Sequence, residues 1–148
     1  MSDYELRIYV YGPGTQDPSH WVFGLHKVDA DLGTILHVLI IGQDANGTLY
    51  QVDRRTGVSL ESKSSRGSFQ LARFPGLLKG KYEEVIMAEG PPRNGDNCQH
   101  WVYEVTLSLE AEELVASGTA QMVHGLIGLS ANDVRSKLGE RWLPAGRK

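Results

Sequence analysis

The sequence predicts an α+β fold, because strand patterns in its N-terminal part are followed by helical patterns in its C-terminal part. Leu6–Tyr11 alternates apolar and polar residues and ends at a turn, Gly12-Pro13-Gly14. Ile35–Ile41 is apolar on both faces, as in a central strand, and leads into a hairpin turn at Asp44-Ala45-Asn46-Gly47. From Cys98 onward, apolar residues recur at helical spacing.

Four further segments read as strands. Trp21–Leu25 is aromatic and β-branched, and Leu49–Val52 follows the hairpin turn. Phe69–Phe74 and Val85–Ala88 are also expected to be short strands. Arg54–Gly67 is rich in Arg, Ser, Gly and Lys with weak periodicity, which predicts a surface loop inside the domain.

The apolar residues after Cys98 fit both the period of a helix and that of a strand. Residues on one helix face are apolar: Cys98, Trp101, Val102, Val105 and Leu109. Val105–Leu109 also alternates as a strand would. We interpret the stretch as a helix, capped by Asp96 or Asn97 and ended by Gly118 as the terminal glycine. Ser130 resembles the cap of a second helix that runs to Leu138.

Composition limits the classes of partner. The chain has 148 residues and is expected to form one domain over residues 1–148. The net charge of −3, without a dense Lys/Arg stripe, argues against nucleic acid or an anionic membrane as partner. No apolar run approaches the roughly 20 residues of a membrane span. We expect a small-molecule or peptide substrate, and the exposed edges and aromatics are compatible with a homodimer.

The single cysteine and the N-terminal sequence bear on the cellular compartment in which the protein is expected. One cysteine cannot form an internal disulfide, and the N-terminal residues lack a basic segment followed by an apolar core. A cytoplasmic location is therefore expected. Neither a metal nor another cofactor is expected, because the sequence has no CxxC, HxxxH or HExxH spacing and no phosphate-binding glycine pattern.

Cys98 is the candidate nucleophile. At a helix N-terminus, unpaired N–H groups and the dipole favour the thiolate, the form that attacks carbonyl groups. A thiol nucleophile needs a base, and the candidates are five histidines: His20, His26, His37, His100 and His124. His20 opens a strand, and His37 interrupts an apolar strand, where an imidazole requires a hydrogen-bonding partner. The other three are expected to be structural or exposed.

At these residues the chain resembles a known superfamily. His20-Trp21-Val22-Phe23, then His37 on the next strand, then Asn97-Cys98-Gln99-His100-Trp101 resemble the permuted papain-like (NlpC/P60-type, lecithin:retinol acyltransferase-like) cysteine hydrolases and acyltransferases. The resemblance implies an antiparallel sheet packed against a helix that carries the nucleophile at its N-terminus. It also implies Cys98 as nucleophile, His20 as general base and His37 as the residue that orients His20.

The resemblance leads to a function hypothesis with open alternatives. Cys98 would form an acyl-enzyme from an amide, ester or thioester, and Trp21, Gln99 and Trp101 would contact the substrate. Gln99 and Trp101 depart from the Glu and Phe that are usual in that superfamily. The alternatives are an inert buried cysteine, a noncatalytic module that binds a ligand or protein in the same cleft, and a cyclase or isomerase that uses the Cys/His pair.

Overall fold

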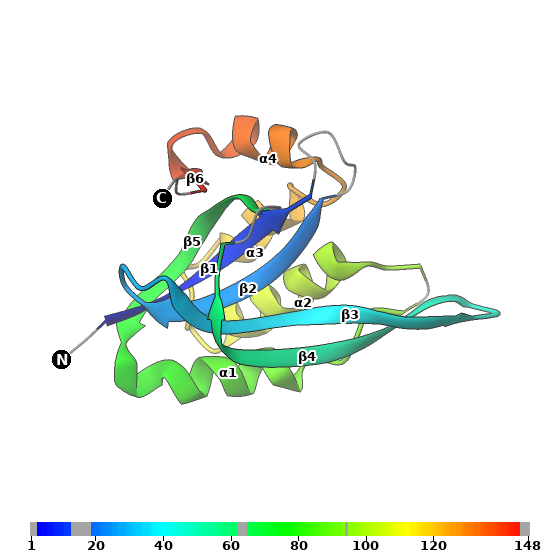
Figure 1. Cartoon of the computed structure of the whole chain (residues 1–148), viewed down its shortest axis with the longest axis horizontal. Coiled ribbons are helices and arrows are strands. Elements are labelled where there is room, and N and C mark those ends of the chain that lie inside the picture. Colours follow the sequence, from blue (N-terminus) through cyan, green and yellow to red (C-terminus); the bar gives the residue numbers. More distant parts are fainter. Residues whose placement is uncertain (1–2, 13–18, 62–64, 94, 146–148) are drawn as a thin grey trace.

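The computed structural model describes residues 3–12, 19–61, 65–93 and 95–145, and it has an α+β fold (Figure 1). A six-stranded antiparallel sheet has the order β4-β3-β2-β1-β5-β6. The strands are β1 (Asp3–Tyr11), β2 (His20–Lys27), β3 (Leu32–Asp44), β4 (Gly47–Ser59), β5 (Ser65–Pro75) and β6 (Leu143–Pro144). The α-helices are α1 (Lys79–Ala88), α2 (Cys98–Ala111), α3 (Thr119–His124) and α4 (Ala131–Leu138), and short 3-10 helices cover Gly76–Leu78 and Gly139–Arg141.

The predicted fold class is confirmed, and so are five of the predicted strands. They correspond to β1, β2, β3, the start of β4, and β5. The hairpin turn lies at its expected place, with Asp44 paired to Gly47. Residues 13 and 14 of the first predicted turn lie outside the described residues.

Two predictions about secondary structure are wrong. Most of Arg54–Gly67 is strand, because β4 pairs with β3 as far as Ser59 and β5 begins at Ser65; residues 62–64 of the predicted loop are not described. Backbone pairing with a long neighbouring strand outweighs the polar composition there. Val85–Ala88 belongs to helix α1, whose buried residues Tyr82, Val85 and Ile86 have the helical i, i+3, i+4 spacing.

The helix at the cysteine is confirmed, but it ends earlier than predicted. Helix α2 stops at Ala111, and Glu113 adopts the left-handed conformation with φ 60°. Gly118, with φ 92°, instead precedes α3. Helix α4 begins as predicted, with the Ser130 hydroxyl accepting the Asp133 N–H at 3.2 Å.

The main core lies between one face of the sheet and the helices. Side chains from β1, β2, β3 and β5 pack there with apolar residues of α1 and α2. At its centre, the Trp101 ring meets the Phe23 ring edge to face, with centroids 5.6 Å apart. No helix in the described ranges is long and apolar enough to cross a membrane.

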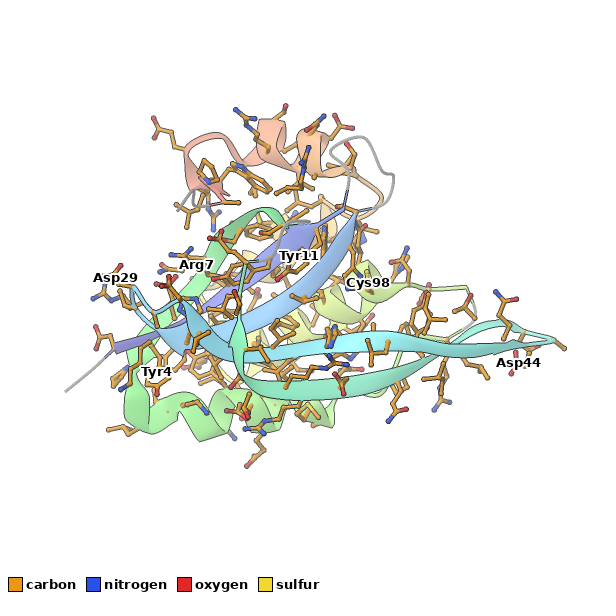
Figure 2. All side chains as sticks on the ribbon, in the orientation of Figure 1. Tyr4, Arg7, Tyr11, Asp29, Asp44 and Cys98 are labelled. Carbon is orange, nitrogen blue, oxygen red and sulfur yellow. The ribbon has the colours of Figure 1, made fainter. Side chains whose placement is uncertain are left out.

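Strands β2 and β3 separate after a short paired stretch, and this separation positions the candidate site. They pair only from Phe23 with Leu36 to Leu25 with Thr34. Beyond this point β3 continues with β4 as a long hairpin that extends away from the sheet, with Asp44 at its tip (Figures 1 and 2). The start of β2 therefore diverges from β3, and Cys98 at the start of α2 lies near this divergence (Figure 2).

Trp101→Ala tests the contribution of α2 to the core. The indole is 1% exposed, so its removal leaves a cavity and should lower the free energy of unfolding by about 3–5 kcal/mol. Leu107→Ala, on the same helix but 39% exposed, is the control and should cost less than about 1 kcal/mol. Urea unfolding followed by circular dichroism measures both, and equal losses would contradict this packing.

Candidate functional site

A capping box fixes the start of helix α2 at Cys98. The Asn97 side chain accepts the Gln99 N–H at 2.9 Å and the His100 N–H at 3.4 Å. In return, His100 Nδ1 accepts the Asn97 N–H at 3.0 Å. His100 thus has the place that Glu or Gln usually takes in a capping box. The prediction of Asn97 as a cap is confirmed, and His100 has a structural role.

A cavity of about 250 Å³ opens at the cysteine, where β2 and β3 diverge. Its lining consists of Ser19, His20, Val38, Leu39, Ile40, Tyr50, Asn97 and Cys98. The β3 residues make much of the wall apolar, while the thiol and the imidazole are its reactive groups. Two of the three predicted catalytic residues, Cys98 and His20, therefore face one cavity.

The environment of Cys98 favours the neutral thiol. Burial raises the pKa of Cys98, and the backbone N–H groups of Trp21, Gln99 and Cys98 itself oppose that rise without cancelling it. Only 9% of the residue is exposed. The expectation of a resting thiolate is therefore wrong, because desolvation of the sulfur outweighs the hydrogen bonds available at the helix start.

His20 is also uncharged at neutral pH. Burial lowers the pKa of His20, and His37 lowers it further. The His20 ring lies against the rings of Tyr11 and His37, each with its centroid 6.4 Å away. Among the described residues, no hydrogen bond joins the His20 imidazole to Cys98 Sγ. The cavity thus contains a neutral thiol and a neutral imidazole that are not hydrogen-bonded to each other.

His37 binds a carboxylate that the sequence analysis did not identify. Its Nε2 lies 3.0 Å from Asp53 Oδ2, across the β3–β4 pair. Arg55 Nε donates to the same oxygen at 2.9 Å. Burial of Asp53 acts to raise its pKa, but the hydrogen bonds from His37 and Arg55 and the charge of the Arg55 guanidinium outweigh burial, so the pKa of Asp53 lies below its ordinary value.

The hairpin register explains why Asp53 was missed. A regular hairpin closed by Asp44 and Gly47 would place Arg54 opposite His37. A β-bulge between Ile40 and Gly42 shifts the register by one residue, which places Asp53 there instead. The only sequence signal for such a bulge is Gly42 within an apolar strand.

The three residues expected to contact substrate lie in the core and do not line the cavity. Trp21 and Gln99 are 0% exposed and Trp101 is 1% exposed. The Trp21 indole N–H donates to Ser19 Oγ at 3.0 Å, and that of Trp101 donates to the Glu89 carbonyl at 3.4 Å. The prediction that these side chains contact the substrate is therefore wrong: they are buried and lie behind the cavity wall.

Gln99 joins the start of α2 to two other segments. Its amide nitrogen donates to the Ser19 carbonyl at 2.9 Å, and its amide oxygen accepts the Gly128 N–H at 2.6 Å. Both ends of the amide are occupied, so the side chain is not available to stabilise an oxyanion. Gln99 instead fixes the distance between Cys98 and the beginning of β2.

The remaining histidines lie away from the cavity. His26 is buried, and its Nε2 is 2.9 Å from the Tyr9 hydroxyl. His124 is exposed on α3, where its ring lies against Tyr103. Within the described residues, no group of three or more His, Cys, Asp or Glu side chains is arranged to hold a metal ion.

Comparison with known proteins places the chain in a family without assigning it an activity. Residues 6–116 match the model of a family of unknown function (DUF6540), and the chain belongs to that family. The matched region extends from β1 beyond the end of α2 and so includes the whole cavity. Neither the curated proteins nor the solved structures contain a match.

Gln99→Leu should destabilise the protein, because it leaves the buried Ser19 carbonyl and the Gly128 N–H without their partner. The expected loss is about 1–3 kcal/mol in the free energy of unfolding, measured by urea titration. Gln121→Leu on the exposed face of α3 should change it by less than about 0.5 kcal/mol. An unchanged midpoint for the Gln99 variant would show that these hydrogen bonds contribute nothing net.

Proposed function

We propose that this protein is a thiol-dependent hydrolase or acyltransferase that acts on an amide, ester or thioester through an acyl-enzyme on Cys98. The observation that supports it most is the placement of Cys98 and His20 in one largely apolar cavity, where β2 and β3 separate. The resemblance of these segments to the permuted papain-like superfamily supports the same chemistry.

In the proposed reaction, His20 acts as a general base during attack. Neutral His20 takes the proton from Cys98 Sγ as the sulfur bonds to the substrate carbonyl carbon. The resulting tetrahedral intermediate collapses when the bond to the leaving group breaks, and the His20 imidazolium protonates that group. A water molecule or an acceptor alcohol or amine, deprotonated by His20, then attacks the thioester and releases Cys98 as a thiol.

General-base attack suits the neutral pair. A preformed thiolate–imidazolium pair would require two charges in a desolvated site, which burial opposes at both groups. Transfer of the proton during attack avoids that resting ion pair. Since no hydrogen bond joins Sγ to His20 among the described residues, the imidazole has to turn toward the sulfur when substrate binds, as catalytic contacts often tighten in the complex.

Backbone N–H groups can stabilise the oxyanion. Those of Trp21 and Cys98 face the sulfur, close to where a carbonyl oxygen would lie during attack. Donors of this kind, held fixed by a strand and a helix start, stabilise negative charge without reorganisation. The apolar wall formed by Val38, Leu39 and Ile40 suits an apolar group next to the reacting carbonyl.

Acylation by p-nitrophenyl butyrate tests the nucleophile and the base. The wild-type protein should gain the mass of one butyryl group, detected by intact-protein mass spectrometry. Cys98→Ala should gain none, and His20→Gln should acylate about 10²–10⁴-fold more slowly because general-base catalysis is lost. His124→Gln, which removes an exposed imidazole, is the matched control. Full acylation of the Cys98 variant would overturn the proposal.

The acylation rate should also depend on pH in a defined direction. His20 must be neutral to accept the proton, and its pKa is lowered from 6.5. The rate should therefore be retained at pH 6.5 and fall only at lower pH, as His20 becomes protonated. A stopped-flow pH profile of p-nitrophenol release measures this, and an acid limb with its midpoint above 6.5 would contradict the assignment.

A noncatalytic ligand-binding module is the second candidate function. The raised pKa of Cys98 and the lack of a described hydrogen bond to His20 favour it, because a cavity with an unactivated thiol can hold an apolar ligand without reacting. In that case, butyryl esters would leave the protein unmodified, while an apolar ligand would raise its thermal midpoint.

A further inference from the structure

His37 lies between a carboxylate and the proposed base. In the sheet order, β3 separates β4 from β2. Toward β4, His37 Nε2 is 3.0 Å from Asp53 Oδ2. Toward β2, the His37 ring meets the His20 ring edge to face at a centroid distance of 6.4 Å. Its Nδ1 is buried and has no hydrogen-bond partner among the described residues.

The contact with Asp53 selects the tautomer of His37. An ionised carboxylate can only accept hydrogen bonds, so the proton between the two groups belongs to His37 Nε2. In neutral His37, Nδ1 then carries a lone pair and is an acceptor. A buried acceptor without a partner is costly, and it gains most from a neighbour that can donate an N–H.

His20 becomes such a donor during the proposed reaction. After it takes the proton of the Cys98 thiol, both of its ring nitrogens carry N–H groups. One N–H serves the reacting atoms, and the other requires an acceptor in a site with little water. His37 Nδ1 is the unpartnered acceptor on the adjacent ring. A rotation of either ring is needed to form this hydrogen bond, because none joins the two rings in the described structure.

We propose that Asp53 is a positioning residue of this site, which fixes His37 in the tautomer whose Nδ1 accepts the N–H of His20. The proposal rests on the proposed Cys98–His20 chemistry. Arg55 supports it by donating to the same Asp53 oxygen at 2.9 Å, which holds the carboxylate against His37. Among the described residues, the ionisable groups found against His37 are His20 from β2 and Asp53 from β4, and Arg55 contacts Asp53.

Asp53→Asn is the direct test. It keeps the shape of the side chain but offers His37 Nε2 either an NH2 donor or an oxygen acceptor, so it no longer fixes the tautomer of His37. With p-nitrophenyl butyrate, the acylation rate should fall about tenfold or more, a part of what general-base catalysis supplies. Asp53→Glu keeps a carboxylate and should stay closer to wild type. Asp44→Asn at the hairpin tip is the matched control and should leave the rate unchanged.

A double-mutant cycle separates positioning from a structural role. If Asp53 acts through His37, then His37→Gln with Asp53→Asn should be no slower than His37→Gln alone. If the double variant is slower than His37→Gln alone by the full factor that Asp53→Asn costs in the wild-type protein, the proposal is overturned. It is also overturned if Asp53→Asn has the wild-type rate while the separate variants Cys98→Ala and His20→Gln abolish or slow acylation. That last result would leave the proposed function intact. An unaffected His20→Gln variant would instead refute both.

Urea midpoints of all variants accompany the rates. An unchanged midpoint with a reduced rate supports the positioning role. If Asp53→Asn lowers the midpoint, the comparison moves to Asp53→Glu and Arg55→Gln. Arg55→Gln keeps the Asp53 carboxylate but removes the guanidinium that holds it, so the acylation rate should fall less than in Asp53→Asn. A wild-type rate for Asp53→Asn at any midpoint would overturn the role.

Discussion

The short pairing of β2 with β3 is the constraint on which the site depends. If the two strands stayed paired beyond Phe23 and Leu36, the sheet would close over the start of α2. Their separation leaves a cavity that the first residue of α2 lines, with His20 from β2 and the apolar residues of β3 as its other walls. The capping box at Asn97 and the buried amide of Gln99 then fix the cysteine at that opening.

Burial determines the chemistry available to these groups. It moves the pKa of Cys98 upward and that of His20 downward, so both changes disfavour charge. The same low-polarity surroundings strengthen any hydrogen bond that forms when a substrate carbonyl develops negative charge. The proposed reaction accordingly moves one proton between neutral partners, and it leaves the charged pair of Asp53 and Arg55 at the more exposed side of β4.

Much of the fold was predictable from the sequence, because the patterns that set it are local. The alternation of β1, the hairpin turn at Asp44 and the helical spacing after Cys98 all specify their elements directly. The extension of β4 was not predictable, because its strand conformation comes from pairing with β3 rather than from its polar residues. Helix α1 was not predictable from Val85–Ala88, because so short an apolar run fits a strand as well as the last turn of a helix.

In the site too, local sequence patterns predicted some residues, whereas others depend on packing and strand register that the sequence does not reveal. Cys98 and His20 were predicted as site residues from their positions at the starts of a helix and a strand, and both line the cavity. Trp21, Gln99 and Trp101 were misplaced, because sequence proximity to a reactive residue does not reveal which side of the element faces the cavity. Asp53 was missed because a single bulge in β3 decides which residue lies opposite His37.

A crystal structure of the protein after reaction with a butyryl ester would test the central claim most directly. The account predicts a thioester on Cys98 Sγ, the butyryl chain against Val38 and Ile40, and the His20 ring turned toward the sulfur. The carbonyl oxygen should lie within hydrogen-bonding distance of the Trp21 or Cys98 backbone N–H. An unmodified thiol beneath an intact ester, or an acyl group on another residue, would contradict it.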